Sequence, residues 1–177
     1  MDFSPVPISL APMAGVTDLA YRLLARECGA DFTVTEFTAA SGLTRKNTYS
    51  WLKVETDPRE APFIPQIFGG DISEMAKTVE MLEDRADIID INFGCPAPKV
   101  CRNDAGAALL RDPDKVVNMV RKCIASTDVP ISVKMRLGTG AGENTALEIS
   151  QRLAEEGVLR ICAVSYTHLT LPTIVDV

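Results

Sequence analysis

Long hydrophobic runs and aromatic residues are scarce in this chain of 177 residues, of which aromatic residues make up 6%. No apolar run approaches the roughly 20 residues that a membrane-spanning helix needs, so we expect no membrane segment. The N-terminal MDFSPVPISLAPM has no basic stretch followed by a long apolar one, and it therefore does not resemble a secretory signal. Hydrophobic residues make up 46% and charged residues 24%, which predicts a globular protein with a substantial core.

Cysteine and histidine are too few and too scattered for a disulfide framework or a zinc site. The chain has one histidine, His168, and five cysteines, which are Cys28, Cys95, Cys101, Cys123 and Cys162. An odd, widely spaced set without an export signal predicts reduced thiols in the cytoplasm. The five residues between Cys95 and Cys101 are not a zinc spacing, so we expect no metal.

Positive charge is also scarce, since the net charge is −6 and the isoelectric point is about 4.8. Such a balance is unfavourable for binding nucleic acid. The cations are nevertheless grouped: Lys99 and Arg102 follow Cys95, and Lys134 and Arg136 share one short segment. A polyanion could be held where those segments converge.

Apolar, β-branched runs alternate with amphipathic ones along the whole chain. We expect strands at 8–13, 32–37, 62–68, 87–93, 131–136 and 160–164. We expect helices at 17–28, 71–85, 112–127 and 143–157. The strand runs read as dense rather than alternating, which is typical of strands covered on both faces. The order predicts an α/β protein with a parallel sheet and no internal linker.

The ends of the predicted strands favour a barrel over an open sheet. Polar or special residues stand at nearly every strand end: Pro12, Met13, Glu36, Gln66, Asn92, Cys95, Lys134 and Arg136. In a (β/α)8 barrel these positions share one face, which carries the active site. The first strand is not followed by the G-x-G-x-x-G of dinucleotide-binding folds. A complete barrel needs about 200 to 250 residues, so we expect an incomplete TIM (β/α)8 barrel with about six of the eight strands.

The C-terminal segment VSYTHLTLPTIVDV resembles the translation of a sequencing adapter. We therefore expect residues 1–164 to be a partial TIM-barrel domain and 165–177 to be a non-native tail, in which His168 has no function. A genuine polar C-terminal segment is the alternative.

Five motifs occur in an order that identifies a family. They are APMAGVTD (11–18), PQIFGGD (65–71), DINFGCPAPKV (90–100), GAALLRDP (106–113) and VKMRLG (133–138). Together they resemble the tRNA-dihydrouridine synthases over roughly residues 8 to 164. The resemblance implies that residues 1–164 are part of an FMN-binding catalytic domain for the reduction of uridine to 5,6-dihydrouridine in tRNA, with NADPH as electron donor. No obligate protein partner is evident from the sequence.

The resemblance also implies a flavin site made by Pro12, Met13, Ala14, Gln66, Asn92 and Lys134. Pro12, Met13 and Ala14 would lie against the flavin ring, and Asn92 near flavin and uracil. An ammonium such as that of Lys134 stabilises the negative charge of a reduced flavin. An amide such as that of Gln66 can both donate to and accept from the edge of the ring.

Cys95 resembles the family's catalytic proton donor. Reduction of the uracil C5=C6 bond needs a hydride at one carbon and a proton at the other, and a thiol that is protonated at neutral pH can supply the proton. The resemblance further implies that Arg136 lies near the flavin or a phosphate of the substrate. We expect Lys99 and Arg102 to contact phosphates of the substrate as well, with solvated loop charges as the alternative. The target base must leave the tRNA stack to reach such a pocket.

Each role has a structural alternative. Cys95 is equally compatible with a small buried hydrophobic residue. Gln66 and Asn92 are compatible with strand-end caps and Glu36 with a structural carboxylate, whereas an unpaired lysine such as Lys134 in an apolar strand favours a ligand. Cys28, Cys123 and Cys162 lie in apolar patterns that predict core positions, and the role of Cys101 stays open.

The chain departs from the family pattern at its end. Ser165 follows Val164 where the family continues with an H-G-R-T segment. We expect the last two strands and the basic helical domain that grips tRNA in that family to be missing from this chain. We therefore expect the chain to be inactive alone and to bind FMN weakly or not at all. An FMN-dependent dehydrogenase of free pyrimidines, of the dihydroorotate or dihydropyrimidine type, and a non-catalytic fragment are the alternative functions.

Overall fold

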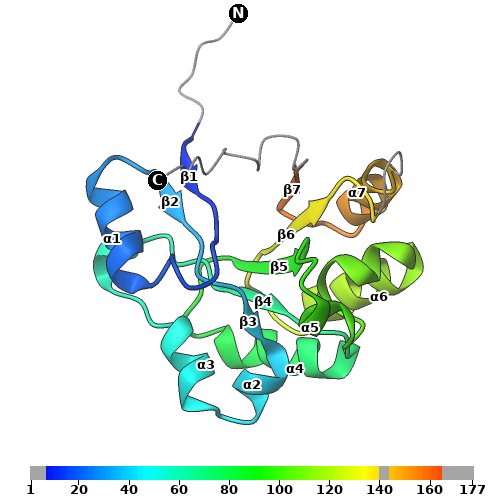
Figure 1. Cartoon of the computed structure of the whole chain (residues 1–177), viewed down its shortest axis with the longest axis horizontal. Helices are drawn as coiled ribbons and strands as arrows, with labels where there is room; N and C mark the ends of the chain where they lie inside the picture. The colour runs from blue at the N-terminus through cyan, green and yellow to red at the C-terminus, as the bar shows by residue number, and fades with distance from the viewer. Residues whose placement is uncertain (1–6, 140–143, 165–177) are drawn as a thin grey trace, which may run out of the picture.

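Strands and helices alternate through the computed structural model, which describes residues 7–139 and 144–164 (Figure 1). The strands are β1 (Ser9–Leu10), β2 (Phe32–Thr33), β3 (Thr38–Ala39), β4 (Gln66–Phe68), β5 (Ile89–Phe93), β6 (Ile131–Arg136) and β7 (Arg160–Val164). The α-helices are α1 (Leu19–Glu27), α2 (Ala40–Thr44), α3 (Thr48–Lys53), α4 (Ile72–Leu82), α5 (Pro98–Cys101), α6 (Pro113–Ile124) and α7 (Ala146–Glu155). Two 3-10 helices complete them, η1 (Pro58–Glu60) and η2 (Gly106–Arg111). The predicted tail at 165–177 lies outside the described residues.

All strand pairs are parallel, in the orders β1-β2 and β3-β4-β5-β6-β7. The strand predicted at 32–37 is divided, because β2 pairs with β1 whereas β3 pairs with β4. Between them the Thr35 N–H donates to the Ile64 carbonyl at 3.1 Å, so the chain passes from one sheet to the other without leaving the hydrogen-bonded surface. The α/β fold with a partial, barrel-like parallel sheet is confirmed, and no closed barrel forms within the described residues.

The sequence predicted some element bounds better than others. β6 and β7 coincide with the predicted strands, whereas β1 and β4 are shorter than predicted. The segment predicted as a strand from residue 62 contains Pro62 and Pro65, which have no N–H to donate, and its ladder begins only at Gln66. The short helices α2, α3 and α5 were not predicted.

Asp side chains begin three of the predicted helices. Asp18, Asp71 and Asp112 accept hydrogen bonds from backbone N–H groups of the first turns of α1, α4 and α6, at 2.9, 2.7 and 3.0 Å. These caps satisfy donors that have no partner inside the helix. The helix starts are therefore encoded locally, as the sequence predicted.

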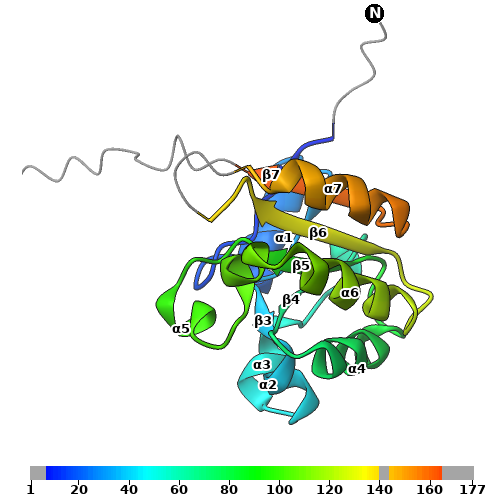
Figure 2. The same cartoon turned by 90° about the vertical axis from the view of Figure 1, so that its right-hand side faces the viewer.

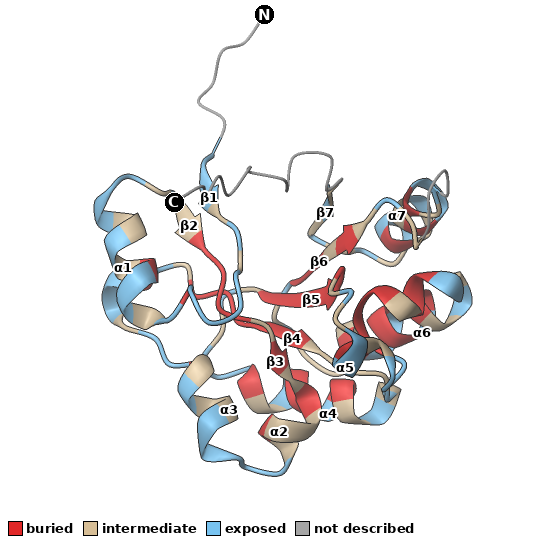
Figure 3. Ribbon diagram, viewed as in Figure 1, coloured by how far each residue is buried: buried red, intermediate tan, exposed pale blue. Residues whose placement is uncertain are grey.

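The core lies between the sheet and a layer of helices in which α2 contacts α4, α4 contacts α6, and α6 contacts α7. Buried residues concentrate on the sheet and on the sheet-facing sides of α4 and α6 (Figure 3). Alternate residues of β5 and β6 join this apolar cluster: Ile89, Ile91, Phe93, Ile131, Val133 and Met135. The intervening residues of the same strands are polar and face the other side.

This alternation corrects the prediction that the strands are dense apolar runs. β5 reads I-D-I-N-F and β6 reads I-S-V-K-M-R, and each places its apolar residues on the helix side. Asp90 and Asn92 are nevertheless 2% and 7% exposed, so β5 is buried on both faces. The inner face of the sheet is therefore polar, and at β5 it is closed to water.

A buried ion pair attaches α1 to the rest of the fold. Arg22 is the only buried residue of α1, and its guanidinium pairs with Glu60 of η1, both groups being 1% exposed or less. Arg22 also donates to the carbonyls of Thr17 and Glu55 at 2.9 and 2.7 Å. Thr33 of β2 donates to Glu60 at 2.9 Å. One cluster thus joins α1, β2 and η1.

The cysteines divide into core and surface positions. Cys123 is fully buried in α6, and burial raises the pKa of its thiol to about 12, which confirms the predicted core position. The core predictions for Cys28 and Cys162 are wrong, because both are exposed. Cys28 caps the C-terminal end of α1, and Cys162 lies on the inner face of β7.

Within residues 7–139 and 144–164, no helix has both the length and the apolarity that crossing a membrane requires. In the same ranges, no three His, Cys, Asp or Glu side chains gather into a group that could hold a metal ion.

Replacing Glu60 by Gln should destabilise the chain by about 3–5 kcal/mol, because it leaves the Arg22 guanidinium buried without a counter-charge. Urea unfolding followed by circular dichroism would measure the loss. Arg59→Gln is the control, since it removes the exposed pair with Asp57 and should leave the stability nearly unchanged. Equal losses in the two variants would contradict the role assigned to the buried pair.

Candidate functional site

Two rows of side chains cross the inner face of the sheet in register. The first row is Gln66, Asp90, Ser132 and Arg160, from β4, β5, β6 and β7. The second row, two residues nearer the carboxyl ends of the strands, is Asn92, Lys134 and Cys162. Because parallel strands present equivalent positions at the same height, residues distant in sequence become neighbours here.

Asp90 is the centre of the first row, where it accepts two hydrogen bonds and faces one guanidinium. The Gln66 amide nitrogen donates to Asp90 Oδ2 at 2.7 Å, and the Ser132 hydroxyl donates to Asp90 Oδ1. Arg160 Nη2 lies 3.7 Å from the same oxygen. Asp90 was not among the predicted site residues, although its place between Ile89 and Ile91 in an alternating strand is the signal that could have found it.

Asn92 connects this cluster to the loop that carries Cys95. Its amide nitrogen donates to the Gln66 side-chain oxygen at 2.9 Å. Its own oxygen accepts from the N–H groups of Gly94 and Cys95, at 3.0 and 2.9 Å. Asn92 therefore caps the turn that follows β5. Gln66, Asn92 and Cys95, predicted as one site from distant motifs, are linked in this way.

Cys95 is half-buried at the start of a tightly packed loop. Its carbonyl accepts from the Ala107 N–H at 2.9 Å and faces the Cys101 thiol at 3.7 Å. Gly106 has a φ of +60°, and a Cβ added there would lie 2.7 Å from the Cys95 carbonyl oxygen. Figure 2 shows α5, which follows this loop, set apart from α4, α6 and α7. η2 thus holds the backbone of Cys95 in place through the Ala107 hydrogen bond and the close approach of Gly106.

The cations of β6 lie next to this loop. Arg136 Nε donates to the Gly94 carbonyl at 2.7 Å, so its side chain crosses from β6 to the turn after β5. Lys134 is half-buried, and among the described residues its ammonium has no hydrogen-bond or ion-pair partner. Its charge acts on Asp90, where it opposes the effect of burial on the pKa of that carboxyl.

The segment from Pro12 to Ala14 forms a separate, largely exposed loop after β1. The Thr17 hydroxyl and the Met13 backbone exchange hydrogen bonds at 3.0 and 3.1 Å. Glu36, which is 7% exposed, accepts from the Gly15 N–H at 2.5 Å and pairs with Lys53 at 3.5 Å. Glu36 therefore holds this loop in place, in agreement with the structural alternative.

Lys99 and Arg102, the predicted substrate contacts, are exposed on and just after α5. Arg102 donates to the Pro98 carbonyl at 3.2 Å. Lys99 lines a groove of about 750 Å³ between α5 and the α2–α3 region. Two further cations, Arg45 and Lys53, line the same groove. The groove is not lined by the side chains of the two inner rows. It flanks the Cys95 loop through Ala97, Val100 and Ala105.

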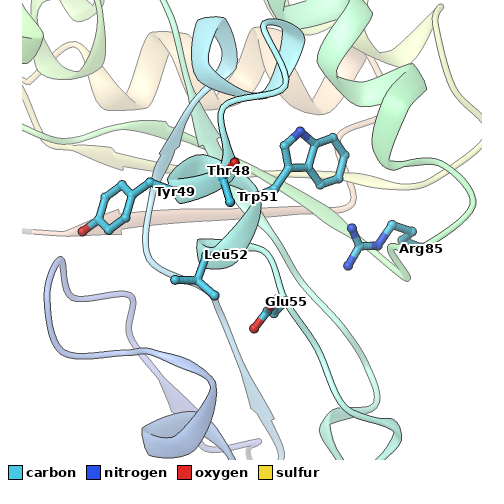
Figure 4. A pocket seen from close by; sticks show the side chains of 6 residues that line it. All are labelled: Thr48, Tyr49, Trp51, Leu52, Glu55 and Arg85. Atoms are coloured by element: carbon cyan, nitrogen blue, oxygen red, sulfur yellow. The ribbon is translucent and has the colours of Figure 1, made fainter.

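A second hollow lies on α3, apart from every predicted site residue. It is lined by Thr48, Tyr49, Trp51, Leu52, Glu55 and Arg85 (Figure 4). The Arg85 guanidinium stacks 5.4 Å from the centre of the Trp51 ring and donates to the Val54 carbonyl at 3.1 Å. These contacts join α3 to the segment after α4. The residues that line this hollow are therefore explained by the packing of these two segments, without a ligand.

Gly106→Ala should destabilise the chain by about 1–3 kcal/mol, because the new methyl group both strains a positive φ and displaces the Cys95 loop. Gly157→Ala is the matched control, since Gly157 also has a positive φ (+88°) but open space around it. Urea unfolding compares the two stabilities, and iodoacetamide labelling of Cys95 reports the loop. We expect the labelling rate to change in Gly106→Ala alone. An unchanged rate there would contradict the proposed support of the loop by η2.

The sequence profile of one family, described as dihydrouridine synthase, matches residues 9–163. A probable tRNA-dihydrouridine synthase of Rhizobium leguminosarum bv. phaseoli is 38% identical over 152 residues, which are 85% of this chain and 48% of that protein. The tRNA-dihydrouridine synthase B of Pseudomonas aeruginosa is 37% identical over 161 residues, 90% of this chain and 48% of the relative.

The tRNA-dihydrouridine synthase B of Escherichia coli K12 is 40% identical over 147 residues, which cover 82% of this chain and 46% of that protein. The chain thus spans about half the length of the curated relatives it matches. The matched segment contains both inner rows and the Cys95 loop. On the family match and these identities, the chain belongs to the dihydrouridine synthase family.

Proposed function

We propose that this chain is part of a cytoplasmic enzyme that reduces uridine to 5,6-dihydrouridine in tRNA. The observation that carries the proposal is the attachment of the Cys95 loop to Asn92, beside Lys134 and Arg136 of the neighbouring strand. The names of the relatives, which are tRNA-dihydrouridine synthases, support the same reaction.

The inner face suits an FMN cofactor because it holds a cation that makes no hydrogen bond or ion pair with the described residues. Lys134 is half-buried on a polar wall and, within the described residues, makes no ion pair. A positive charge in such a place is costly unless a ligand neutralises it, and the ring of a reduced flavin carries negative charge. Lys134 and the backbone from Pro12 to Ala14 are the groups that would hold the cofactor. Both amide atoms of Asn92 are already bonded, to Gln66 and to the backbone of the Cys95 loop, so Asn92 would shape the site beside them.

Gln66 has a different role in this proposal from the one that its motif implies. Its side chain is 0% exposed, and both of its amide atoms are bonded to Asp90 and Asn92. We infer that Gln66 acts by holding Asn92, and that contact with the ring edge would require it to rearrange.

The chemistry that FMN supplies when bound is donation of hydride to C6 of the uracil, with NADPH as the source of electrons. Cys95 then gives its thiol proton to C5 from a loop whose backbone is fixed by Asn92 and Ala107. Because the loop backbone is already fixed, less conformational entropy is lost when the Cys95 thiol is brought up to C5 of the uracil. Arg136, Lys99 and Arg102 bind the phosphates around the target uridine, which enters the site out of its stack.

Dihydrouridine formation in unmodified tRNA by the full-length protein tests the proposal. We expect NADPH-dependent product with tRNA and none with free uracil or dihydroorotate. Turnover of a free pyrimidine without turnover of tRNA would instead establish the alternative, a free-pyrimidine dehydrogenase.

Cys95→Ala in the full-length protein should lower kcat by roughly 10²-fold or more, because the variant has no acid beside C5. Cys101→Ala is the control, since it removes a half-buried thiol from α5, the helix that follows the Cys95 loop, and its kcat should stay within about threefold of the wild-type value. Single-turnover formation of dihydrouridine measures both. Normal turnover in Cys95→Ala would exclude the assigned role.

Lys134→Met should make the reduction potential of bound FMN more negative by roughly 30 mV or more, because a cation that stabilises the reduced ring is lost. Lys122→Met, which changes an exposed lysine on α6, should leave the potential unchanged. Spectroscopic titration with a dye of known potential measures the difference. Identical potentials would place Lys134 away from the flavin.

A further inference from the structure

An unbroken series of side-chain hydrogen bonds leads from Asp90 to the backbone of Cys95. Gln66 Nε2 donates to Asp90 Oδ2 (2.7 Å), Asn92 Nδ2 donates to Gln66 Oε1 (2.9 Å), and the Cys95 N–H donates to Asn92 Oδ1 (2.9 Å). The three side chains are 0%, 2% and 7% exposed for Gln66, Asp90 and Asn92. Because these side chains are buried, water could not easily take the place of a lost hydrogen bond.

The direction of each link follows from the one before it. An Asp90 oxygen that accepts obliges Gln66 to turn its NH2 group toward Asp90 and its oxygen toward Asn92. Asn92 must then point its NH2 group at Gln66, which leaves its oxygen for the N–H of Cys95. Reversing any one amide would set two donors or two acceptors against each other at the next link. The orientation at Cys95 is thus determined at Asp90.

Asp90 is itself held from its other side. Its Oδ1 accepts from the Ser132 hydroxyl and faces the Arg160 guanidinium at 3.7 Å, which leaves Oδ2 for Gln66. Burial raises the pKa of the Asp90 carboxyl, against the opposing effects of these donors and of Lys134. Since a hydroxyl can donate or accept, a proton on Oδ1 would be accommodated by Ser132, and Oδ2 would still accept from Gln66.

We propose that Asp90 is a positioning residue of the enzyme, which sets the orientation of the Gln66 and Asn92 amides and, through them, the placement of the Cys95 loop. It acts through these residues rather than by touching the substrate. The consequence for catalysis rests on the proposed function, whereas the consequence for the loop does not.

Asp90→Asn in the full-length protein tests the first step. The new NH2 group is repelled by the Arg160 guanidinium, so it turns toward Gln66 and forces that amide to reverse. We expect the rate of Cys95 labelling by iodoacetamide, followed by peptide mass spectrometry with exposed Cys28 as internal reference, to change roughly tenfold. The kcat for dihydrouridine formation should fall roughly tenfold or more, with little change in KM for tRNA.

Exchanging the two groups tests the direction of the links. In the double variant Asp90→Asn/Gln66→Glu, the new amide donates to the new carboxylate, which can again accept from Asn92. Size, total charge and the number of hydrogen bonds are kept. We expect labelling and kcat to return to within about threefold of the wild-type values.

Ser132→Ala is the matched control within the same buried cluster. It removes one hydrogen bond from Asp90 but none of the links to Cys95, so its thermal midpoint should fall while Cys95 labelling stays at the wild-type rate. This separates positioning of the loop from a general loss of stability.

The proposal fails if Asp90→Asn labels Cys95 at the wild-type rate, or if the double exchange behaves like Asp90→Asn. Should Asp90→Asn not fold, Gln66→Met takes its place, since it removes the middle link while Ser132 still bonds Asp90. A wild-type labelling rate in that variant overturns the proposal equally. If the wild-type protein makes no dihydrouridine, the proposed function fails, and the labelling comparison still decides the role of Asp90.

Discussion

The period of two along a β-strand is the constraint on which the site depends. In β5 and β6 the same backbone presents Ile91 and Val133 to the helices and Asn92 and Lys134 to the inner face. A slip of one residue would bury charge in the apolar layer and expose the apolar residues. The helix-facing core therefore sets the register, and the register sets which polar groups meet.

The two inner rows differ in whether their polar groups have partners. In the first row Asp90 is surrounded by Gln66, Ser132 and Arg160, so its oxygens are satisfied and the row is rigid. In the second row the half-buried Lys134 ammonium has no hydrogen-bond or ion-pair partner among the described residues. A rigid layer beneath a row with an available charge is the arrangement that a binding site requires, because the support does not have to reorganise when the ligand arrives.

Much of this arrangement could be predicted from the sequence because it is local. β6 and the helix caps follow from short patterns, and the polar residues at strand ends indicated Asn92, Lys134 and Arg136. What could not be predicted depends on contacts between distant segments. The partner of Arg22 lies 38 residues away, and no pattern in a single sequence indicates which acid it meets. Cys162 illustrates the same limit, since its exposure depends on what lies beside β7.

The attachment of α1 has a consequence for how the fold responds to temperature. Tyr21 and Leu24 are 43% and 55% exposed, so α1 gains little from apolar burial and is held through Arg22 and Glu60. The free-energy cost of dehydrating charged groups falls on heating, whereas stabilisation by apolar burial levels off. Warming therefore favours this attachment relative to the core, and α1 is less prone to detach with heat than its exposed apolar residues suggest.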